Sequence, residues 1–595
     1  MSLIKILGVL LTFNFSVQAT RHFHPLFAWE TTPLDPIDLA RLVQDTNTSQ
    51  YEHLFPFTGQ NTPATPNRLS PGTCKVFPGD NDWPSPEAWD AFGKVLGGAL
   101  IKTVPAAAVC YANTGLYDAQ RCSQVQANFS NPYFHEDDPT SNFFPNFQGR
   151  TCLPTSDPRS SNCTHGAFPV YAVNATNVQQ IQLAINFARN TNIRLVIKNT
   201  GHCYLGKSTG AGALSMWTHH LNDIRYFDDL KVDGFEQASL TTHNTYLPTR
   251  CPTANTSKSV GYAGGYVAGG GHTPLSGLYG MAADHVLALQ LVTAEGHFTT
   301  VSPKHNPDLY WALRGGGAGI FGVVTSVIIR AQPKLPVVTS TFSISTSDTV
   351  SAETFWKGMR GYFELFIPFT DAGTYSWGVL VNTNGNYVFS MSPFFAPNHT
   401  IESFNKLGED VMLNAAGGMN IAGNWLLPRR NWENRTKFEE TFAVIKRHSE
   451  TGRMLMGYHQ APRNRANVDN AVNNAWREAV CFLILAAVID AEPLAFTPGL
   501  IGAASREFRD EILAPFRAVA PESDGGGAYL NEAHVDDPNW REAFYGGHYE
   551  RLSSIKQKLD PGHVFYATTA VGSERWEVRD GDQGIQTQNG RLCRT

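Results

Sequence analysis

The stretch IKNTGH at residues 197–202, followed by STGAG at 208–212, decides how the fold is interpreted. It comes directly after Leu195 and Val196, which are typical of a strand. A tight turn of small residues after a strand exposes consecutive backbone N–H groups, and such groups suit a pyrophosphate. Two interpretations stay open from these residues alone, because a glycine-rich turn is often only a turn and His202 is typical of a satisfied core or loop histidine.

A second glycine-rich stretch reads VGYAGGYVAGGGH at 260–272 and is followed by LYGMAAD at 278–284. Glycine lets the backbone approach a flat or phosphorylated ligand closely, at a cost in conformational entropy. A bulged, glycine-rich strand of a barrel is the alternative, and the residues alone favour neither interpretation.

Regular elements flank both stretches. The apolar pattern predicts a strand at 170–173, a helix at 177–192 and a strand at 195–197, then a strand at 286–293, a helix at 306–313 and a strand at 323–329. For the second helix we expect Asn306 as the N-cap, Pro307 at the first helical position and Gly315 beyond the end. The two units together predict a mixed α and β domain.

The rest of the chain has a different pattern of predicted strands and helices. The alternating strands at 339–346 and 375–381, with amphipathic helices such as 402–415, indicate an antiparallel sheet covered by helices. The predicted fold class is therefore α+β. The predicted units are a signal peptide at 1–19, an irregular N-terminal segment at 20–165 with a helix at 83–96, a first domain at 166–333, a second at 334–519 and a C-terminal segment at 520–595 with a helix at 549–559.

The N-terminus indicates secretion, because a short apolar stretch after Lys5 ends in the small-residue pattern around Ala19. That stretch and the apolar run at 479–489 are both shorter than the roughly 20 residues of a membrane-spanning helix. We therefore expect cleavage after Ala19 and no membrane span. Sequons for N-glycosylation lie at Asn47, Asn128, Asn162, Asn174, Asn255, Asn398 and Asn434. Some of the nine cysteines are expected to form disulfides, and the odd number leaves at least one outside a pair.

Composition excludes several classes of function. A net charge of −6 without runs of Lys or Arg argues against nucleic-acid and anionic-membrane partners, so we expect a small-molecule partner. We also expect a monomer. Zinc-type Cys and His spacings are absent from the sequence, and we expect no structural metal. The sequence also contains neither a Walker lysine loop nor a GxSxG elbow.

Further motifs complete a resemblance to a known family. They are NPDLYWALRGGG at 306–317, AYLNEA at 528–533, NW at 539–540, FYG at 544–546, DP at 560–561 and VGSE at 571–574. Together with the two glycine-rich stretches, these motifs resemble the FAD-linked oxidases of the vanillyl-alcohol-oxidase (VAO) type, in particular the secreted fungal members of the berberine-bridge-enzyme-like branch. The resemblance implies a two-part FAD-binding domain of the PCMH type and a separate substrate domain.

The resemblance also implies roles for individual residues. In the family, the histidine of an R/K-x-x-G-H loop is bonded to the 8α-methyl group of the flavin, and Lys198, Gly201 and His202 match this loop. The resemblance implies a cofactor site made of Lys198, Asn199, Thr200, Gly201, His202, Ser208, Gly261, Gly264, Gly270, Gly271, His272, Tyr529 and Asn531. The loop backbone at 199–201 would hold the pyrophosphate.

One segment departs from the family pattern. Many relatives bind FAD by a second bond, from the cysteine of a Cys-Pro-Thr that runs directly into the second glycine-rich stretch. Here six residues, 254–259, separate Cys251-Pro252-Thr253 from Val260. A second bond from Cys251 therefore stays open, and residues 230–260 are either a native variant or the product of a faulty gene model.

A bound flavin implies removal of a hydride from a carbon that carries a hydroxyl or amine group, with oxygen or another acceptor reoxidising the enzyme. The candidates for the base that takes the substrate proton are Tyr375, Tyr458, His459, Glu532 and His534. The aromatic residues that line either the substrate face or the core are Trp356, Phe363, Trp377 and Phe389. Two alternatives remain: an inactive secreted glycoprotein of the same fold that binds FAD poorly, and a secreted carbohydrate-binding or hydrolytic protein.

Overall fold

The structure is a computed structural model of the α+β class, as predicted. It describes residues 26–58, 70–149, 151–159, 161–225, 231–232, 235–236, 259–405, 420–464, 467–488, 500–579, 581 and 587–595. The predicted signal peptide, Asn255 and Cys251 lie outside the described residues. The side chain of Tyr458 is also outside them.

The first sheet carries the IKNTGH loop at residues 197–202. Its strands occur in the order β1-β2-β4-β3, with bounds Leu100–Lys102, Tyr171–Asn174, Leu214–Trp217 and Leu195–Lys198. β2, β4 and β3 are parallel, and β1 is antiparallel to β2. Helix α5 (Val178–Thr191) connects β2 to β3, and the Asn177 side chain caps it by accepting a hydrogen bond from the N–H of Gln180. The predicted strand, helix and strand are therefore all present within one or two residues.

The second sheet is antiparallel and has the order β8-β7-β9, with bounds Phe298–Val301, Val286–Val292 and Val323–Ile329. Helix α7 (Pro307–Ala312) follows β8, and Pro307 opens it as predicted. Asn306 occupies the predicted N-cap position, but its backbone is left-handed with φ of +52° and its side chain makes no capping hydrogen bond.

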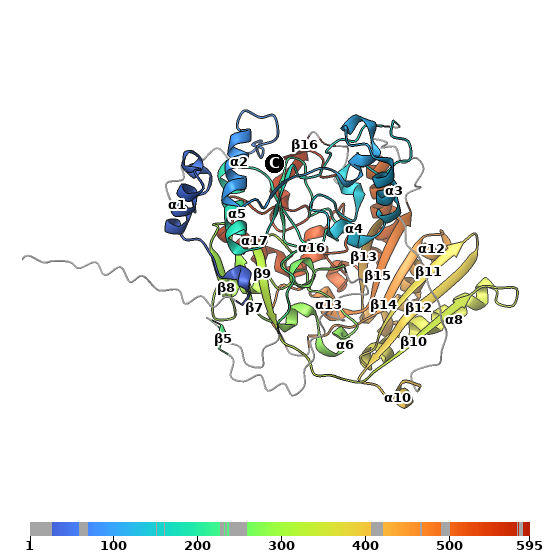
Figure 1. The fold of residues 1–595 in the computed structure, drawn as a ribbon. Coiled ribbons are helices and arrows are strands. Elements are labelled where there is room, and N and C mark those ends of the chain that lie inside the picture. Colours follow the sequence, from blue (N-terminus) through green and yellow to red (C-terminus); the bar gives the residue numbers. More distant parts are fainter. Residues whose placement is uncertain are drawn as a thin grey trace, which may run out of the picture.

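The large sheet contains six antiparallel strands in the order β10-β12-β11-β14-β15-β13. Their bounds are Val337–Ser345, Asn386–Pro397, Tyr375–Thr383, Met454–His459, Ala479–Val488 and Asn420–Pro428. Helices α8 (Ala352–Glu364), α9 (Phe366–Asp371) and α12 (Arg435–Glu450) pack against its strands. In Figure 1 this sheet and strands β7, β8 and β9 lie on opposite sides of the molecule. Of the predicted helix at 402–415, the structure describes α10 (Ile401–Asn405).

Most of the second-domain aromatic residues named above belong to the core. Trp356, Phe363 and Phe389 are buried in one hydrophobic cluster, and Trp377 packs against another. The core interpretation of these four side chains is the one that the structure supports.

Helices cover the remaining parts of the fold. The N-terminal segment contains α1 (Pro36–Asp45), α2 (Pro86–Val95), α3 (Ala119–Asn128) and α4 (Pro132–Glu136). The other short helices are α6 (Ser276–Tyr279), α11 (Arg430–Glu433) and α13 (Ala475–Glu478). The C-terminal third contains α14 (Leu500–Glu507), α15 (Ala514–Val519), α16 (Trp540–Tyr545) and α17 (Tyr549–Leu559). In the described part of the chain, none of the helices combines the length and the apolar character that a bilayer crossing demands.

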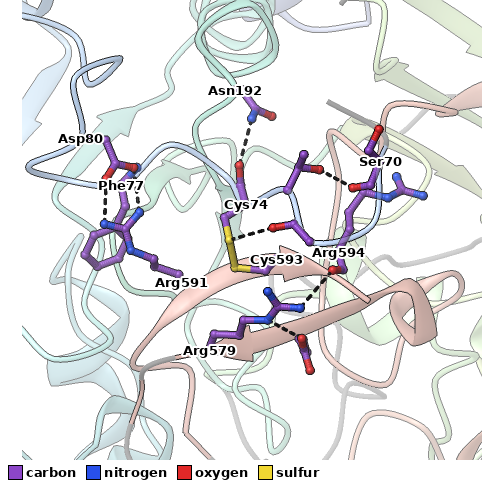
Figure 2. Close-up of a disulfide and its surroundings, with 12 residues drawn as sticks. Ser70, Cys74, Phe77, Asp80, Asn192, Arg579, Arg591, Cys593 and Arg594 are labelled. Atoms are coloured by element: carbon purple, nitrogen blue, oxygen red, sulfur yellow. Dashed lines mark hydrogen bonds and ion pairs between the residues drawn. A yellow bond between two sulfur atoms is a disulfide. The ribbon is translucent and has the colours of Figure 1, made fainter. Parts of the chain in front are cut away.

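Disulfides hold the N-terminal segment in place. Cys110–Cys122 and Cys152–Cys163 lie within it, and Cys74–Cys593 joins it to the C-terminal hairpin of β16 (Trp576–Arg579) and β17 (Arg591–Arg594). Figure 2 shows this last bond beside the ion pair of Arg591 with Asp80, whose N–O distance is 2.7 Å. The hydrogen bonds from this arginine hold the pKa of Asp80 below its usual value. Cys203 and Cys481 are free thiols.

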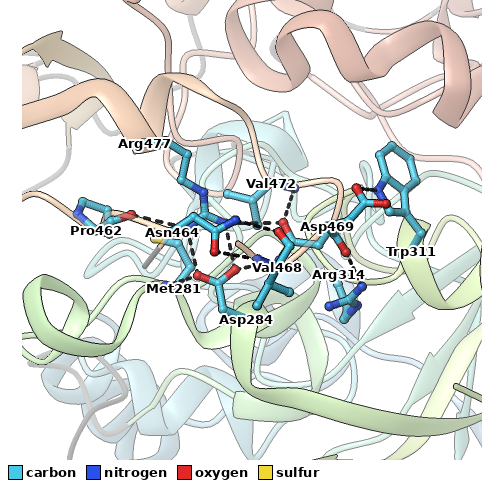
Figure 3. Close-up of polar contacts among 11 residues, drawn as sticks. Met281, Asp284, Trp311, Arg314, Pro462, Asn464, Val468, Asp469, Val472 and Arg477 are labelled. Atoms are coloured by element: carbon cyan, nitrogen blue, oxygen red, sulfur yellow. Dashed lines mark hydrogen bonds and ion pairs between the residues drawn. The ribbon is translucent and has the colours of Figure 1, made fainter. Parts of the chain in front are cut away.

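A buried polar network joins the loop after the second glycine-rich stretch to the connector between β14 and β15 (Figure 3). Asp284 accepts hydrogen bonds from both terminal nitrogens of Arg477, at 2.7 and 2.8 Å, and from Asn470 at 2.7 Å. Trp311 donates to Asp469 of the same connector at 2.8 Å. Because a buried ion pair is costly to break, this network fixes the position of the glycine-rich stretch relative to the large sheet.

Candidate cofactor and active site

A single open cavity collects most of the predicted site residues. Its space between atoms, including the open mouth, is about 1420 Å³. Five segments supply most of its lining: the end of β3 with the loop at 199–208, the second glycine-rich stretch, residues 318–324 at the start of β9, the tail residues 529–532, and Tyr566. Thr218 and Leu313 complete it. The predicted residues among them are Asn199, Thr200, Gly201, His202, Ser208, Gly261, Gly264, His272, Tyr529, Asn531 and Glu532.

The loop after β3 is shaped by contacts that only glycine permits. Gly201 has φ of +79°, and a Cβ there would come within 3.0 Å of Cε of Lys198. The Asn199 side chain donates a hydrogen bond to Oγ1 of Thr218 at 3.2 Å. His202 stacks on Phe143 with ring centroids 5.2 Å apart, and burial lowers the pKa of its imidazole. The ring that faces the cavity is therefore favoured in its neutral form.

Lys198 supports this loop from behind and does not line the cavity. Its Nζ donates hydrogen bonds to the backbone oxygens of His135 at 2.9 Å and Asp138 at 2.8 Å. Burial lowers its pKa to about 8. Direct contact between Lys198 and a cofactor, which the resemblance implies, is not what this geometry provides.

The second glycine-rich stretch forms the floor of the cavity. A Cβ on Gly261 would lie only 2.1 Å from Oδ1 of Asn199, so the two loops approach each other closely because this residue has no side chain. Gly270 and Gly271 do not line the cavity. They have φ of +113° and +69° and make the turn that brings His272 to the wall.

The tail residues close the cavity from the other side. Asn531 donates hydrogen bonds to the backbone oxygen of Gly265 at 2.9 Å and to the hydroxyl of Tyr529 at 2.7 Å. Oε1 of Glu532 lies 3.7 Å from Nε2 of His272, and both side chains are buried. Oε2 of Glu532 is buried and has no hydrogen-bond partner in the described part of the chain. The structure thus places an unsatisfied carboxylate oxygen at the cavity wall.

Of the other base candidates, Tyr375, His459 and His534 do not line the cavity. His459 forms hydrogen bonds with the hydroxyls of Thr374 at 2.9 Å and Ser376 at 2.6 Å, and burial lowers its pKa to about 3. His534 interacts with Ser505, and burial lowers its pKa to about 4. Tyr375 is buried in the core cluster behind the cavity wall, and burial raises its pKa.

Several cavity residues were missed by the sequence analysis, among them Cys203, Tyr204, Lys207, Thr218 and Tyr566. Lys207 is the residue that a search for charge would have found, because it lies between the two halves of the first glycine-rich stretch. Tyr566 has no such local signal. Outside the cavity, Glu136, Asp137 and His219 each place one ligand atom within 4.8 Å of the others, and Asp137 is largely exposed.

Comparison with known proteins identifies the family. The chain matches the model of the FAD binding domain over residues 169–302 and the model "Berberine and berberine like" over residues 528–572. It is 34% identical over 578 residues to the VAO-type flavoprotein oxidase VAO615 of Thermothelomyces thermophilus, covering 89% of this chain and 97% of the relative. It is 33% identical to the FAD-linked oxidoreductase ZEB1 of Gibberella zeae, covering 88% of this chain and 95% of the relative.

A solved structure is similar over the same range. The crystal structure of the VAO-type flavoprotein VAO615 from Myceliophthora thermophila C1 matches with a TM-score of 0.74 and 31% identity, covering 88% of this chain and 100% of the other. The fold and site define a flavoprotein with a PCMH-type FAD-binding domain. The chain belongs to the VAO-type family of FAD-linked oxidoreductases.

The residues of the cavity fit FAD. The glycine floor gives a flat ring and a phosphate chain access to the backbone, as Gly261 shows. Two buried polar atoms that face the cavity, Oγ of Ser208 and Oε2 of Glu532, have no hydrogen-bond partner among the described residues. Buried polar atoms are rarely left unpaired, so they are suited to a polar ligand.

Proposed function

We propose that the protein is a secreted oxidase with covalently bound FAD, which removes a hydride from a carbon bearing a hydroxyl or amine group and passes the electrons to oxygen. The observation that carries the proposal is the cavity itself, where His202 and the unsatisfied carboxylate oxygen of Glu532 line the same space. Bound FAD supplies the hydride acceptor for this reaction.

His202 is the proposed attachment point for the flavin. The bond joins an imidazole nitrogen to the 8α carbon and replaces one N–H and one C–H bond. Formation of this bond would release two protons and two electrons, which molecular oxygen would accept as hydrogen peroxide. The lowered pKa of His202 supports this role, because the neutral imidazole has the lone pair that bond formation needs. Cys251, outside the described residues, stays a proposed second attachment point.

Glu532 is the proposed base among the five candidates. It combines a place in the cavity wall with an unpaired, buried carboxylate oxygen. A base must lie within hydrogen-bond reach of the proton that it takes, and this atom is free to reach a substrate hydroxyl or ammonium group. His272, 3.7 Å from the other carboxylate oxygen, orients the side chain. Tyr529 and Asn531 hold the adjoining wall through their mutual hydrogen bond.

Secretion, glycosylation and a monomeric state belong to the same proposal. The three disulfides support an oxidising compartment. Asparagines at five sequons are exposed, namely Asn47, Asn128, Asn162, Asn398 and Asn434, while Asn174 is partly buried. We also propose the domain limits at 165, 333 and 519, since β9 ends at Ile329 and β10 begins at Val337.

The first test is a visible spectrum of the secreted protein before and after acid precipitation. We expect flavin absorbance to stay in the wild-type pellet and to become extractable or disappear in His202→Ala, whereas His305→Ala, at an exposed histidine, keeps the wild-type result. Peroxide release is then measured with a panel of alcohols and amines. A colourless wild-type protein would contradict a flavin-dependent function, and activity that appears only with a dye acceptor would contradict the oxidase assignment.

A further inference from the structure

The cavity contains one lysine and one carboxylate among the described residues, and the two have different surroundings. Lys207 has no hydrogen-bond or ion-pair partner in the part of the chain that the structure describes. Its neighbour Ser208 also lines the cavity, and the buried Oγ of Ser208 has no hydrogen-bond partner there either. Two adjacent side chains thus present an unpaired cation and an unpaired hydroxyl to the same space.

The carboxylate and the ammonium group come from different segments of the cavity wall. Glu532 belongs to the tail, where it faces His272 at 3.7 Å. Lys207 belongs to the loop after β3, and burial lowers its pKa.

An unpaired ammonium group in a buried site is unfavourable, because it has lost water without gaining an anion. A bound phosphate group compensates for the lost hydration of the ammonium group. Lysine binds phosphate as a point charge, and a serine hydroxyl donates a further hydrogen bond. The ligand that the proposed function places here is a dinucleotide whose negative charge is confined to its pyrophosphate.

We infer that Lys207 and Ser208 bind the pyrophosphate of the dinucleotide, which leaves the flavin ring to the part of the cavity wall that holds Glu532 and His202. This inference rests on the proposed function, and it adds an ion pair to the backbone contacts that the loop at 199–201 provides. It also explains why the Oγ of Ser208 is buried without a hydrogen-bond partner among the described residues.

The test uses the full-length His202→Ala protein that also carries Cys251→Ala, so that neither proposed attachment point can form a covalent bond. Dissociation constants for ADP, FAD and riboflavin are measured by calorimetry at about 50 and 200 mM NaCl. Adding Lys207→Met is expected to weaken ADP and FAD binding by about 10- to 100-fold, because a hydrogen bond to a charged group is lost, and to leave riboflavin binding within about twofold. The salt dependence of ADP binding decreases at the same time.

Three further variants serve as controls. Lys207→Arg retains the charge and is expected to bind ADP within about threefold of the parent that carries both alanine substitutions. Ser208→Ala weakens ADP binding by less than Lys207→Met does. Lys304→Met, at an exposed lysine outside the cavity, has no effect. Circular dichroism checks that each protein is folded.

The outcomes separate this inference from the proposed function. Unchanged ADP affinity in Lys207→Met overturns the inference, and so does an equal loss of ADP and riboflavin binding, which would assign Lys207 to the ring. If the parent binds neither FAD nor ADP, and the wild type holds no flavin, both proposals fail together. If the wild type is a yellow oxidase while Lys207→Met binds ADP normally, only the inference fails.

Discussion

The cavity wall and the large sheet each contain a buried histidine with an oxygen-bearing neighbour, but the two histidines have different surroundings. His459 of the large sheet has a hydroxyl within 2.9 Å of each ring nitrogen, from Thr374 and Ser376. Three phenylalanine rings, Phe366, Phe369 and Phe394, have centroids 5.0–5.5 Å from its ring. At the cavity, His272 faces Glu532 at 3.7 Å, and one oxygen of that carboxylate has no hydrogen-bond partner in the described residues.

This difference in hydrogen bonding separates polar groups that stabilise the fold from polar groups that are suited to bind a ligand. Around His459, folding itself satisfies the polar atoms, so the cluster stabilises the sheet and offers nothing to a substrate. Around Glu532, folding leaves an acceptor buried and unpaired, which costs free energy unless a ligand donates to it. Both residues were candidates for the base, and their surroundings distinguish them where residue type does not.

The largest expected effect comes from removing the charge at the cavity. Glu532→Gln is expected to lower kcat/KM by about 100- to 10,000-fold, the usual contribution of a general base, while the flavin content of the acid pellet stays at the wild-type level. Glu439→Gln, at a carboxylate that pairs with Arg360 outside the cavity, is the matched control and retains activity. Activity of Glu532→Gln within tenfold of wild type would remove Glu532 from the role of base.

The converse change is made in the large sheet. His459→Ala is expected to lower the free energy of unfolding by about 2–4 kcal/mol, because it opens a cavity among aromatic rings and removes the hydrogen bonds of the imidazole with Thr374 and Ser376. Activity per bound flavin stays within about threefold of wild type. Urea unfolding and peroxide release measure the two quantities on one preparation. A loss of activity without a loss of stability would reverse the comparison and make His459 part of the chemistry.

The cavity floor is sensitive to a single methyl group. Gly261→Ala places a Cβ against Oδ1 of Asn199, at 2.1 Å before any adjustment, so one of the two loops must move. Overpacking of this kind costs about 1–3 kcal/mol, and we expect it to appear as a reduced flavin content in the purified protein. The ratio of flavin to protein absorbance measures it. Full flavin content in this variant would mean that the loops separate without affecting the cofactor.

The histidine of the large sheet also predicts a pH dependence of stability. The pKa of His459 is about 3 in the folded protein against an ordinary value of 6.5, so unfolding takes up a proton between these pH values. Stability from this residue is present above pH 6.5 and is lost as the pH falls toward 3, by up to about 1.4 kcal/mol per pH unit. His459→Gln removes the group that takes up this proton. Urea unfolding at pH 7, 6 and 5 is therefore expected to show a smaller decrease in the free energy of unfolding with falling pH than in wild type. Parallel declines would show that His459 is protonated in the fold.

Local signals in the sequence predicted the elements, and non-local packing determined the site. Helix α5 was predictable because Asn177 caps it and its buried residues repeat at helical spacing. Asn306 was predicted as a cap on the same rule, yet its left-handed backbone removes the capping bond. Glu532 and His202 are 330 positions apart in the sequence, so only folding brings them to one cavity.

Residue type and motif do not show which side chains the fold leaves unpaired. Lys198 was favoured because it matches a motif, but backbone oxygens of the N-terminal segment occupy its ammonium group. Lys207 was passed over because it matches no motif, although it is the cavity lysine without a described partner. Whether a polar side chain is already paired depends on residues far away in the chain, which no local pattern encodes.

The smallest expected effect lies in the helical cover of the large sheet and completes the contrast with the cavity floor. Gly358 is an exposed interior residue of α8, and a Cβ there would meet no heavy atom within 4 Å. Gly358→Ala is therefore expected to raise the free energy of unfolding by about 0.5–1 kcal/mol, because alanine loses less backbone entropy in a helix than glycine does. Flavin content and kcat/KM remain those of the wild type, so a glycine-to-alanine substitution that damages the cavity at Gly261 stabilises the helix at Gly358. Urea unfolding of Gly261→Ala, Gly358→Ala and the wild type measures whether the free energy of unfolding changes in opposite directions in the two variants. If both variants lost flavin to the same extent, the glycines of the cavity floor would have no special role, and the cofactor would depend on global stability alone.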